Sequence, residues 1–318
     1  MIPATVSQLV ADKFQQAQAS ESVVFKKLDA KNVKDPKSGM RYSVSLVPSL
    51  SEKPEFGQTA EGDDPLANSE PELTVLEDLD GSGDLKLVLN KYPVTENHSL
   101  LITNKFKNQL DALSPEELTT AYRLVCKMDN EDENKRHLVI YNSGPASGSS
   151  QFHKHLQLVE IPRNFSPFQD VLTNGKDHFL PNLKQEPLQD GKVSFAHFVL
   201  PLPEDADEVN EDLLAMCYFS LLQRTLTFFQ DWLNETPDLV KSYNLLMTKN
   251  WICLVPRSAI KAKTLNVGFN ALGYAGILLI KDQESFDKVI ENPAVVNELL
   301  GECGFPNTEG VKPNEYNY

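Results

Sequence analysis

Residues 151–160 decide the fold, and they read Gln-Phe-His-Lys-His-Leu-Gln-Leu-Val-Glu. His153, His155 and Gln157 are spaced two apart, so their side chains share one face if this segment is a β-strand. The preceding residues 142–150 read Asn-Ser-Gly-Pro-Ala-Ser-Gly-Ser-Ser, a Gly/Ser loop able to turn backbone N–H groups and hydroxyls toward an anion. The sequence therefore places a strand, two imidazoles and a candidate phosphate-binding loop side by side.

Further short strands are expected in the first half of the chain. Residues 137–142 predict a strand that frames the Gly/Ser loop together with a strand over residues 152–161. Residues 85–91 and 99–103 read as an antiparallel pair joined by a turn.

Two helices are predicted from local signals. Ser114, Pro115 and Glu117 supply an N-cap, a proline at the first helical position and a capping-box glutamate. Residues 210–233 carry an apolar stripe at helical spacing, which indicates packing against a core rather than a cofactor site.

The second half of the chain echoes the strand-rich layout of the first without repeating its histidines. Residues 243–248 and 251–255 predict a hairpin, and residues 274–280 predict another strand. We therefore expect an α+β fold, an antiparallel sheet with flanking helices, in which a degenerate duplicated half continues the same sheet.

Length and composition favour one domain over residues 1–318. A chain of 318 residues with 41% apolar content can bury a sizeable core. Residues 51–84 hold eleven acidic residues and one lysine among several Pro and Gly, so this segment is expected to be a loop excursion.

Charge and cysteine usage bound the partners and the compartment. The formal net charge of −15 disfavours nucleic-acid binding, so a phosphorylated substrate would be held locally. There is no signal-like N-terminus and no apolar run long enough to span a membrane. The four cysteines form no C-x-x-C pair, which favours a reducing compartment, the cytoplasm and also the nucleus.

Three explanations of the histidine row stay open from the residues alone. A metal site needs more ligands than two imidazoles, and no cysteine cluster or nearby carboxylate supplies them. A satisfied structural pair is common, but it leaves the adjoining loop unexplained. The third is nucleophilic catalysis at phosphorus, for which His155, the central ring of the row, is the nucleophile we would choose.

The row and its surroundings resemble a known family. The His-x-His-x-Gln pattern of residues 153–157 is similar to the transferase branch of the histidine triad superfamily, whose hydrolases usually carry a third histidine at the position of Gln157. Together with residues 52–55, 89–91, 141–150, 191–198 and 268–270, it resembles the fungal diadenosine tetraphosphate phosphorylases, or ATP adenylyltransferases, over nearly the whole chain.

This resemblance implies a histidine-triad-like fold and reversible phosphorolysis of diadenosine tetraphosphate to ATP and ADP. His155 would attack an α-phosphorus, ATP would leave, and phosphate would take AMP from the enzyme as ADP. His153 would position the nucleophile and Gln157 would donate to the α-phosphate. Sulfate in place of phosphate would give adenosine phosphosulfate, an ADP sulfurylase side activity.

The resemblance also implies a set of substrate contacts. Besides Gln157, they are Lys53, Asn90, Lys91, Asn142, Gly148, Ser149, Ser150, Gln151, Asn270, Ala271, Leu272 and Lys281. No metal ligand is expected in the protein. A divalent cation such as Mg²⁺ would arrive with the substrate phosphates, and no organic cofactor is expected.

Two other functions stay open: a dinucleoside polyphosphate hydrolase and a non-catalytic nucleotide-binding protein. Only small-molecule partners are expected, and a monomer is favoured. Among the other histidines, His98 is expected to be structural at a strand end, and His137, His178 and His197 have no assigned chemistry.

Overall fold

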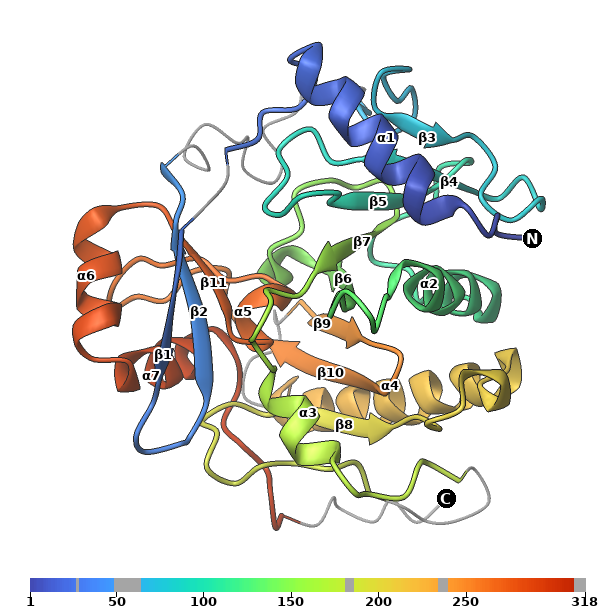
Figure 1. Ribbon diagram of the computed structural model, residues 1–318. Helices are drawn as coiled ribbons and strands as arrows, with labels where there is room; N and C mark the ends of the chain where they lie inside the picture. The colour runs from blue at the N-terminus through green and yellow to red at the C-terminus, as the bar shows by residue number, and fades with distance from the viewer. Residues whose placement is uncertain (27–28, 49–63, 181–185, 234–239, 312–318) are drawn as a thin grey trace.

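The computed structural model describes residues 1–26, 29–48, 64–180, 186–233 and 240–311. Its centre is an eight-stranded sheet in which each neighbouring pair is antiparallel (Figure 1). In sheet order the strands are β3 (Thr74–Leu76), β4 (Leu85–Leu89), β5 (Ser99–Thr103), β7 (His155–Glu160), β6 (His137–Ser143), β9 (Ser242–Met247), β10 (Trp251–Arg257) and β8 (Phe198–Pro201).

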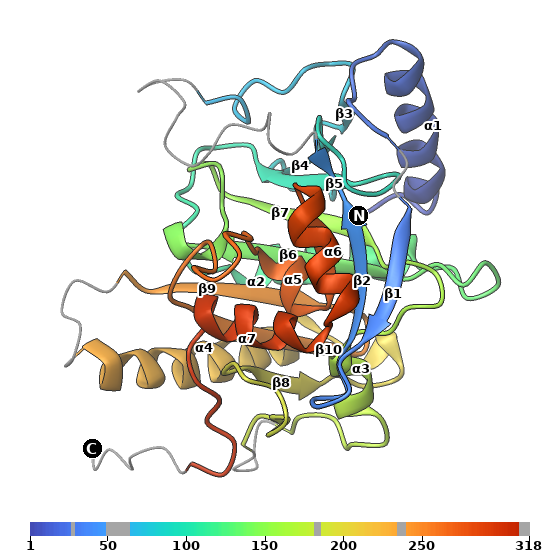
Figure 2. The same cartoon turned by 90° about the vertical axis from the view of Figure 1, so that its left-hand side faces the viewer.

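A second, three-stranded sheet packs beside the large one. It has the order β1 (Ala30–Lys34), β2 (Arg41–Leu46) and β11 (Ile277–Ile280), with β1 antiparallel and β11 parallel to β2. In Figure 2 this sheet stands in front of the large sheet together with the C-terminal helices.

Helices cover both faces of the large sheet. One face packs against α1 (Val6–Ala19), α2 (Pro115–Met128) and α4 (Glu211–Leu233). On the other side lie α3 (Phe168–Thr173), α5 (Ala271–Tyr274), α6 (Gln283–Glu291) and α7 (Ala294–Cys303). Alternate residues of the central strands enter the two cores, Val139 and Tyr141 on one side and Leu138 and Ile140 on the other.

The two halves of the chain meet in the middle of the large sheet. β6 of the first half pairs with β9 of the second, with Asn142 opposite Asn244. The orders β6-β7-β5 and β9-β10-β8 run outward from this pair, and α2 contacts α4 across it. The predicted α+β fold with one continuous sheet is confirmed, as are the capping box of α2 and the hairpin of β9 and β10.

Three predicted strands were too long, and the one predicted over residues 85–91 ends at Leu89 as β4. β7 begins at His155, so His153 precedes it. His153 bridges Asn108 and the Lys154 N–H donates to the Lys107 carbonyl oxygen at 2.8 Å, while the Lys154 carbonyl oxygen still accepts from the Thr103 N–H of β5 at 3.2 Å. The predicted strand over 274–280 is split by Gly276, whose left-handed φ of 84° cannot continue a strand. β11 then joins the small sheet, so it does not extend the large one.

The acidic segment is more than a loop where the structure describes it. From Asp64 onward it contributes β3 to the edge of the large sheet. The rest of the segment, with Lys53, lies outside the described residues.

Candidate active site

His155 is the first residue of β7, buried at the end of the strand that adjoins the Gly/Ser loop. Its backbone N–H donates to Gln109 Oε1 at 2.8 Å, and its ring Nδ1 lies 2.8 Å from the carbonyl oxygen of His153. Because a carbonyl oxygen only accepts, the network assigns the proton to Nδ1 and the lone pair to Nε2. This is the tautomer that a nucleophilic imidazole needs.

His153 does not share a strand face with His155; it is held between two acceptors. Its Nδ1 lies 2.8 Å from Asp64 Oδ2, and its Nε2 lies 2.6 Å from the carbonyl oxygen of Thr103. Because a carbonyl oxygen only accepts, Nε2 donates to Thr103, and Nδ1 faces the Asp64 carboxyl group. The His153 ring therefore holds its own backbone in place, and the carbonyl oxygen of that backbone accepts the hydrogen bond from His155 Nδ1.

Gln157 lies two residues further along β7 and contacts His98, the histidine expected to be structural. The Val94 N–H lies 3.3 Å from His98 Nδ1, so Nδ1 accepts and Nε2 carries the proton. His98 Nε2 then donates to Gln157 Oε1 at 3.0 Å. The amide N–H₂ of Gln157 is thereby turned away from His98 and can donate elsewhere. Asn90 Nδ2 lies 3.5 Å from the accepting His98 Nδ1, which brings this predicted contact into the same cluster.

Two glycines shape the Gly/Ser loop between β6 and β7. Gly144 has φ 90° and Gly148 has φ 83°, a region that favours glycine. A Cβ at Gly144 would lie 2.3 Å from Ser242 Oγ, and one at Gly148 would lie 2.9 Å from both Asn270 Cβ and the Phe269 carbonyl oxygen. The loop thus packs directly against the segment that precedes α5.

Asn142, at the end of β6, lies across from His155. The Ile140 and Gln157 pair fixes the register, and Gln109 Nε2 donates to the carbonyl oxygens of both Asn142 and His155, at 3.0 and 3.1 Å. Opposed residues share a sheet face, so the Asn142 amide and the His155 ring lie on the same side. Asn142 is 2% exposed, and its Nδ2 has no hydrogen-bond partner among the described residues.

The start of α5 completes this cluster. Asn270 Oδ1 caps the helix by accepting from the Leu272 N–H at 3.0 Å, and the Ala271 N–H donates to Asn142 Oδ1 at 3.1 Å. The structure therefore brings Asn142, Gly148 and the Asn270 to Leu272 segment together with His155 and Gln157.

The remaining predicted contacts lie in different places. Ser149 is buried and donates to the Gln151 carbonyl oxygen at 3.1 Å, beside a half-buried Ser150. Lys91 forms an exposed ion pair with Glu70 at 2.7 Å. Lys281 is exposed at the end of β11, in the small sheet.

Lys154, between the two histidines, anchors the start of β7 from the opposite side. It is 2% exposed, and its Nζ lies 2.7 Å from Glu117 Oε2 and 2.6 Å from the Ala112 carbonyl oxygen. Burial alone would raise the pKa of Glu117, but hydrogen bonds from Lys107, Lys154 and the Ser114 N–H outweigh it and hold the pKa below its usual range. The N-terminal cap of α2 is thus bonded to the residue that precedes β7.

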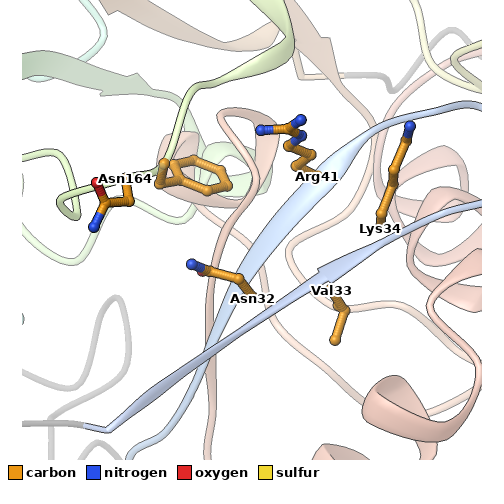
Figure 3. Close-up of a pocket in the computed structure, with 6 residues that line it drawn as sticks. Asn32, Val33, Lys34, Arg41 and Asn164 are labelled. Atoms are coloured by element: carbon orange, nitrogen blue, oxygen red, sulfur yellow. The ribbon is translucent and has the colours of Figure 1, made fainter.

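A separate cavity of about 220 Å³ lies away from this cluster (Figure 3). It is lined by Asn32, Val33, Lys34, Arg41, Asn164 and Phe165. His155 begins β7, and Asn164 follows the other end of this strand. The two ends of β7 are about 17 Å apart at 3.3 Å per residue. The cavity contains none of the predicted site residues.

The sequence interpretation missed Arg257 and Asn244. Arg257 is completely buried and donates to Asn244 Oδ1 at 2.6 Å, and Asn244 Nδ2 donates to Asn142 Oδ1 at 2.7 Å. Each is a strongly polar residue in a largely apolar strand, and that interruption is a signal that could have drawn attention to them.

The described residues hold neither a metal-binding cluster nor a membrane-spanning helix. They contain no group of three His, Cys, Asp or Glu side chains placed to hold a metal ion. None of the helices in these parts of the chain has the length and apolar character needed to cross a membrane. Their four cysteines are all free, and Cys217, Cys253 and Cys303 are buried.

Comparison with known proteins gives matches over nearly the whole chain. Residues 1–173 match the Ap4A phosphorylase N-terminal domain, and residues 191–306 match the ATP adenylyltransferase C-terminal domain. Protein APA1 of Saccharomyces cerevisiae is 56% identical over 100% of this chain and 99% of its own. Diadenosine 5',5'''-P1,P4-tetraphosphate phosphorylase 2 of the same yeast is 52% identical, with 100% of both chains covered.

A solved structure shares the fold. The crystal structure of yeast Ap4A phosphorylase Apa2 superposes with a TM-score of 0.90 at 52% identity, covering 100% of both chains. The same yeast enzyme in complex with Ap4A gives a TM-score of 0.88 at 50% identity, covering 97% of this chain and 100% of the other. The chain therefore belongs to the Ap4A phosphorylase family of ATP adenylyltransferases.

Proposed function

We propose that this protein catalyses the reversible phosphorolysis of diadenosine tetraphosphate through a covalent AMP intermediate on His155. The observation that carries the proposal is the bond from His155 Nδ1 to the His153 carbonyl oxygen, which leaves the Nε2 lone pair as nucleophile. The family relationship supports the substrate, since a yeast relative has been solved with Ap4A and, in another structure, with AMP.

The steps follow from this geometry. Nε2 attacks one α-phosphorus, the bond from that phosphorus to the bridging oxygen breaks, and ATP leaves. The Nδ1–H bond to the carbonyl stabilises the positive ring of the phosphoramidate. Inorganic phosphate then attacks the same phosphorus, the P–N bond breaks and ADP forms. In this proposal the amides of Gln157 and Asn142 and the backbone N–H groups of residues 148–150 would donate to the phosphate oxygens.

A divalent cation such as Mg²⁺ would enter with the substrate and neutralise its phosphates. Sulfate as the second nucleophile would give adenosine phosphosulfate. We infer that the protein works as a monomer in the cytoplasm and nucleus, where its free thiols would stay reduced.

Trapping of the intermediate tests the mechanism. Wild-type protein incubated with Ap4A labelled in its α-phosphates, without inorganic phosphate, should carry labelled AMP that survives alkali and is lost in acid. His155→Ala should form no adduct and lose several orders of magnitude in turnover, because the nucleophile itself is gone. His178→Ala, a half-buried histidine outside the cluster, is the matched control and should keep both.

Product analysis separates phosphorolysis from the alternatives. With saturating phosphate the products should be ATP and ADP, with label from the phosphate in ADP. AMP with ATP at every phosphate concentration would identify a hydrolase. Tight binding of Ap4A without any turnover would identify a non-catalytic nucleotide-binding protein.

A further inference from the structure

Arg257, the last residue of β10, is a buried cation with no carboxylate partner in the described part of the chain. Its side chain is 0% exposed, and no carboxylate oxygen of the described residues lies within 4.0 Å of its nitrogens. Its guanidinium stacks on Tyr274 at 4.7 Å. All five guanidinium N–H groups are used, on Cys303 O at 3.1 Å, Ser147 O at 3.2 Å, Asn244 Oδ1 at 2.6 Å, Ala259 O at 2.8 Å and Phe269 O at 2.9 Å.

Two of these acceptors belong to the walls of the active site. Ser147 lies in the Gly/Ser loop, and Phe269 precedes the Asn270 cap of α5. A Cβ at Gly148 would come within 2.9 Å of the Phe269 carbonyl oxygen, so these two walls are already in close contact. Arg257 therefore links the Gly/Ser loop to the start of α5 through hydrogen bonds to both.

Arg257 also determines which way two amides point. Guanidinium groups only donate, so the Asn244 atom that meets Arg257 must be Oδ1. Asn244 Nδ2 then donates to the Ser147 carbonyl oxygen at 2.9 Å and to Asn142 Oδ1 at 2.7 Å. Since the Ala271 N–H also donates to Asn142 Oδ1, the Asn142 amide cannot be turned over without setting donor against donor.

The consequence is a buried donor with a fixed direction. Asn142 Nδ2 has no hydrogen-bond partner among the described residues, on the sheet face that carries His155. An unpaired donor in a buried site is unfavourable, and a bound acceptor would relieve this. Phosphate and ribose oxygens are acceptors of this kind.

We propose that Arg257 is a positioning residue of this active site: through Asn244 it holds the Asn142 amide with Nδ2 turned toward the bound nucleotide. This inference rests on the proposed function for the identity of the nucleotide. It adds that Arg257, from the second half of the chain, determines the orientation of the Asn142 donor in the first half.

A double-mutant cycle on AMP binding tests the proposal. Arg257→Lys keeps the charge but replaces the five-donor fork by one ammonium, which cannot reach both walls and Asn244. It should weaken AMP binding, measured by isothermal titration calorimetry, about tenfold, the size of one hydrogen bond to a charged group. In an Asn142→Ala background the same change should weaken binding less than about twofold, because the donor that Arg257 orients is already absent.

A second variant covers the case in which Arg257→Lys does not fold. Asn244→Asp has the same size and still accepts from Arg257, but it cannot donate to Asn142. The Asn142 amide then meets a mismatch in either orientation, Oδ1 against the new carboxylate or Nδ2 against the Ala271 N–H, so its donor is no longer held toward the nucleotide and AMP affinity should again fall about tenfold. Arg136→Lys, in the half-buried pair with Asp170 at 2.8 Å, is the control and should bind AMP like the wild type.

The outcomes are distinct. Equal losses of affinity in the presence and absence of the Asn142 amide, or an Asn244→Asp variant that binds AMP normally, would overturn the role of Arg257 even if ATP and ADP are formed. Coupled losses without any ADP formation would support Arg257 and overturn the proposed reaction. A wild-type protein that does not bind AMP would overturn both.

Discussion

At the scale of single residues, the direction of each hydrogen bond determines how the histidine and amide side chains of the site are oriented, which the residue types alone do not. His155 and His98 each have two possible orientations, and each meets one neighbour with a single role: the His153 carbonyl oxygen only accepts, and the Val94 N–H only donates. The Val94 N–H fixes His98, and His98 fixes Gln157. The histidine expected to be structural therefore orients the amide that is predicted to meet the phosphate.

Gln157→Glu tests this orientation. The new carboxylate still accepts from His98 Nε2, but it replaces the amide donor with a negatively charged oxygen. We expect turnover of Ap4A to fall at least about 100-fold, since a lost donor at a charged transition state costs about 2.7–4 kcal/mol. Steady-state kinetics with Ap4A and phosphate measure the effect. Gln223→Glu, on the exposed side of α4, should leave turnover unchanged, and a fully active Gln157→Glu enzyme would contradict the role of the amide.

At the scale of elements, the Gly/Ser loop depends on backbone shape and on close packing together. Gly148 combines a φ of 83° with a Cβ position that is 2.9 Å from Asn270 Cβ. Ser and Gly content predicted an anion-binding loop, but it did not show that the second wall of the loop is the start of α5. That wall is more than 100 residues away in the sequence.

Gly148→Ala should lower both stability and activity. Left-handed backbone alone is unfavourable by about 1–2 kcal/mol for alanine, and the contact with Asn270 adds to it. Gly175→Ala is a matched control, because Gly175 has φ 67° and nothing within 4 Å of its Cβ position. Urea unfolding should show the larger loss for Gly148→Ala, and kinetics with Ap4A should show a loss for that variant alone. Equal effects of the two variants would mean that packing against α5 is unimportant.

At the scale of the whole molecule, sequence rules succeeded where their signals are local. The capping box of Ser114 and Glu117 located α2, and alternation located the strands around His155, because these features involve residues a few positions apart. The contacts of Asn142 with Asn244 and of Asn244 with Arg257 exist because β6 pairs with β9. No local pattern encodes that pairing, so the sequence identified Asn142 only by resemblance and missed its two supports.

A buried histidine makes the stability of the whole fold depend on pH. His197 lies just before β8; its Nε2 accepts from the Asp190 N–H and its Nδ1 donates to the Phe195 carbonyl oxygen, both at 2.8 Å. Burial lowers the pKa of His197 from 6.5 to about 4, so the folded protein holds the neutral ring while the unfolded chain takes up a proton below pH 6.5. Stability from this group is complete above pH 6.5 and is lost as pH falls toward 4.

We therefore expect the free energy of unfolding to drop by about 2 kcal/mol between pH 7.5 and pH 5 through His197 alone. Urea denaturation at these two pH values measures the change. Both values lie above the range in which Glu117 titrates, because the pKa of that carboxyl is lowered. His197→Gln is less stable at pH 7.5 but should lose about 2 kcal/mol less than the wild type on acidification. Val199→Ala, which weakens the neighbouring β8 without removing a titratable group, should keep the wild-type pH dependence. If His197→Gln loses as much unfolding free energy between pH 7.5 and pH 5 as the wild type does, the buried neutral ring is not the cause of the pH dependence.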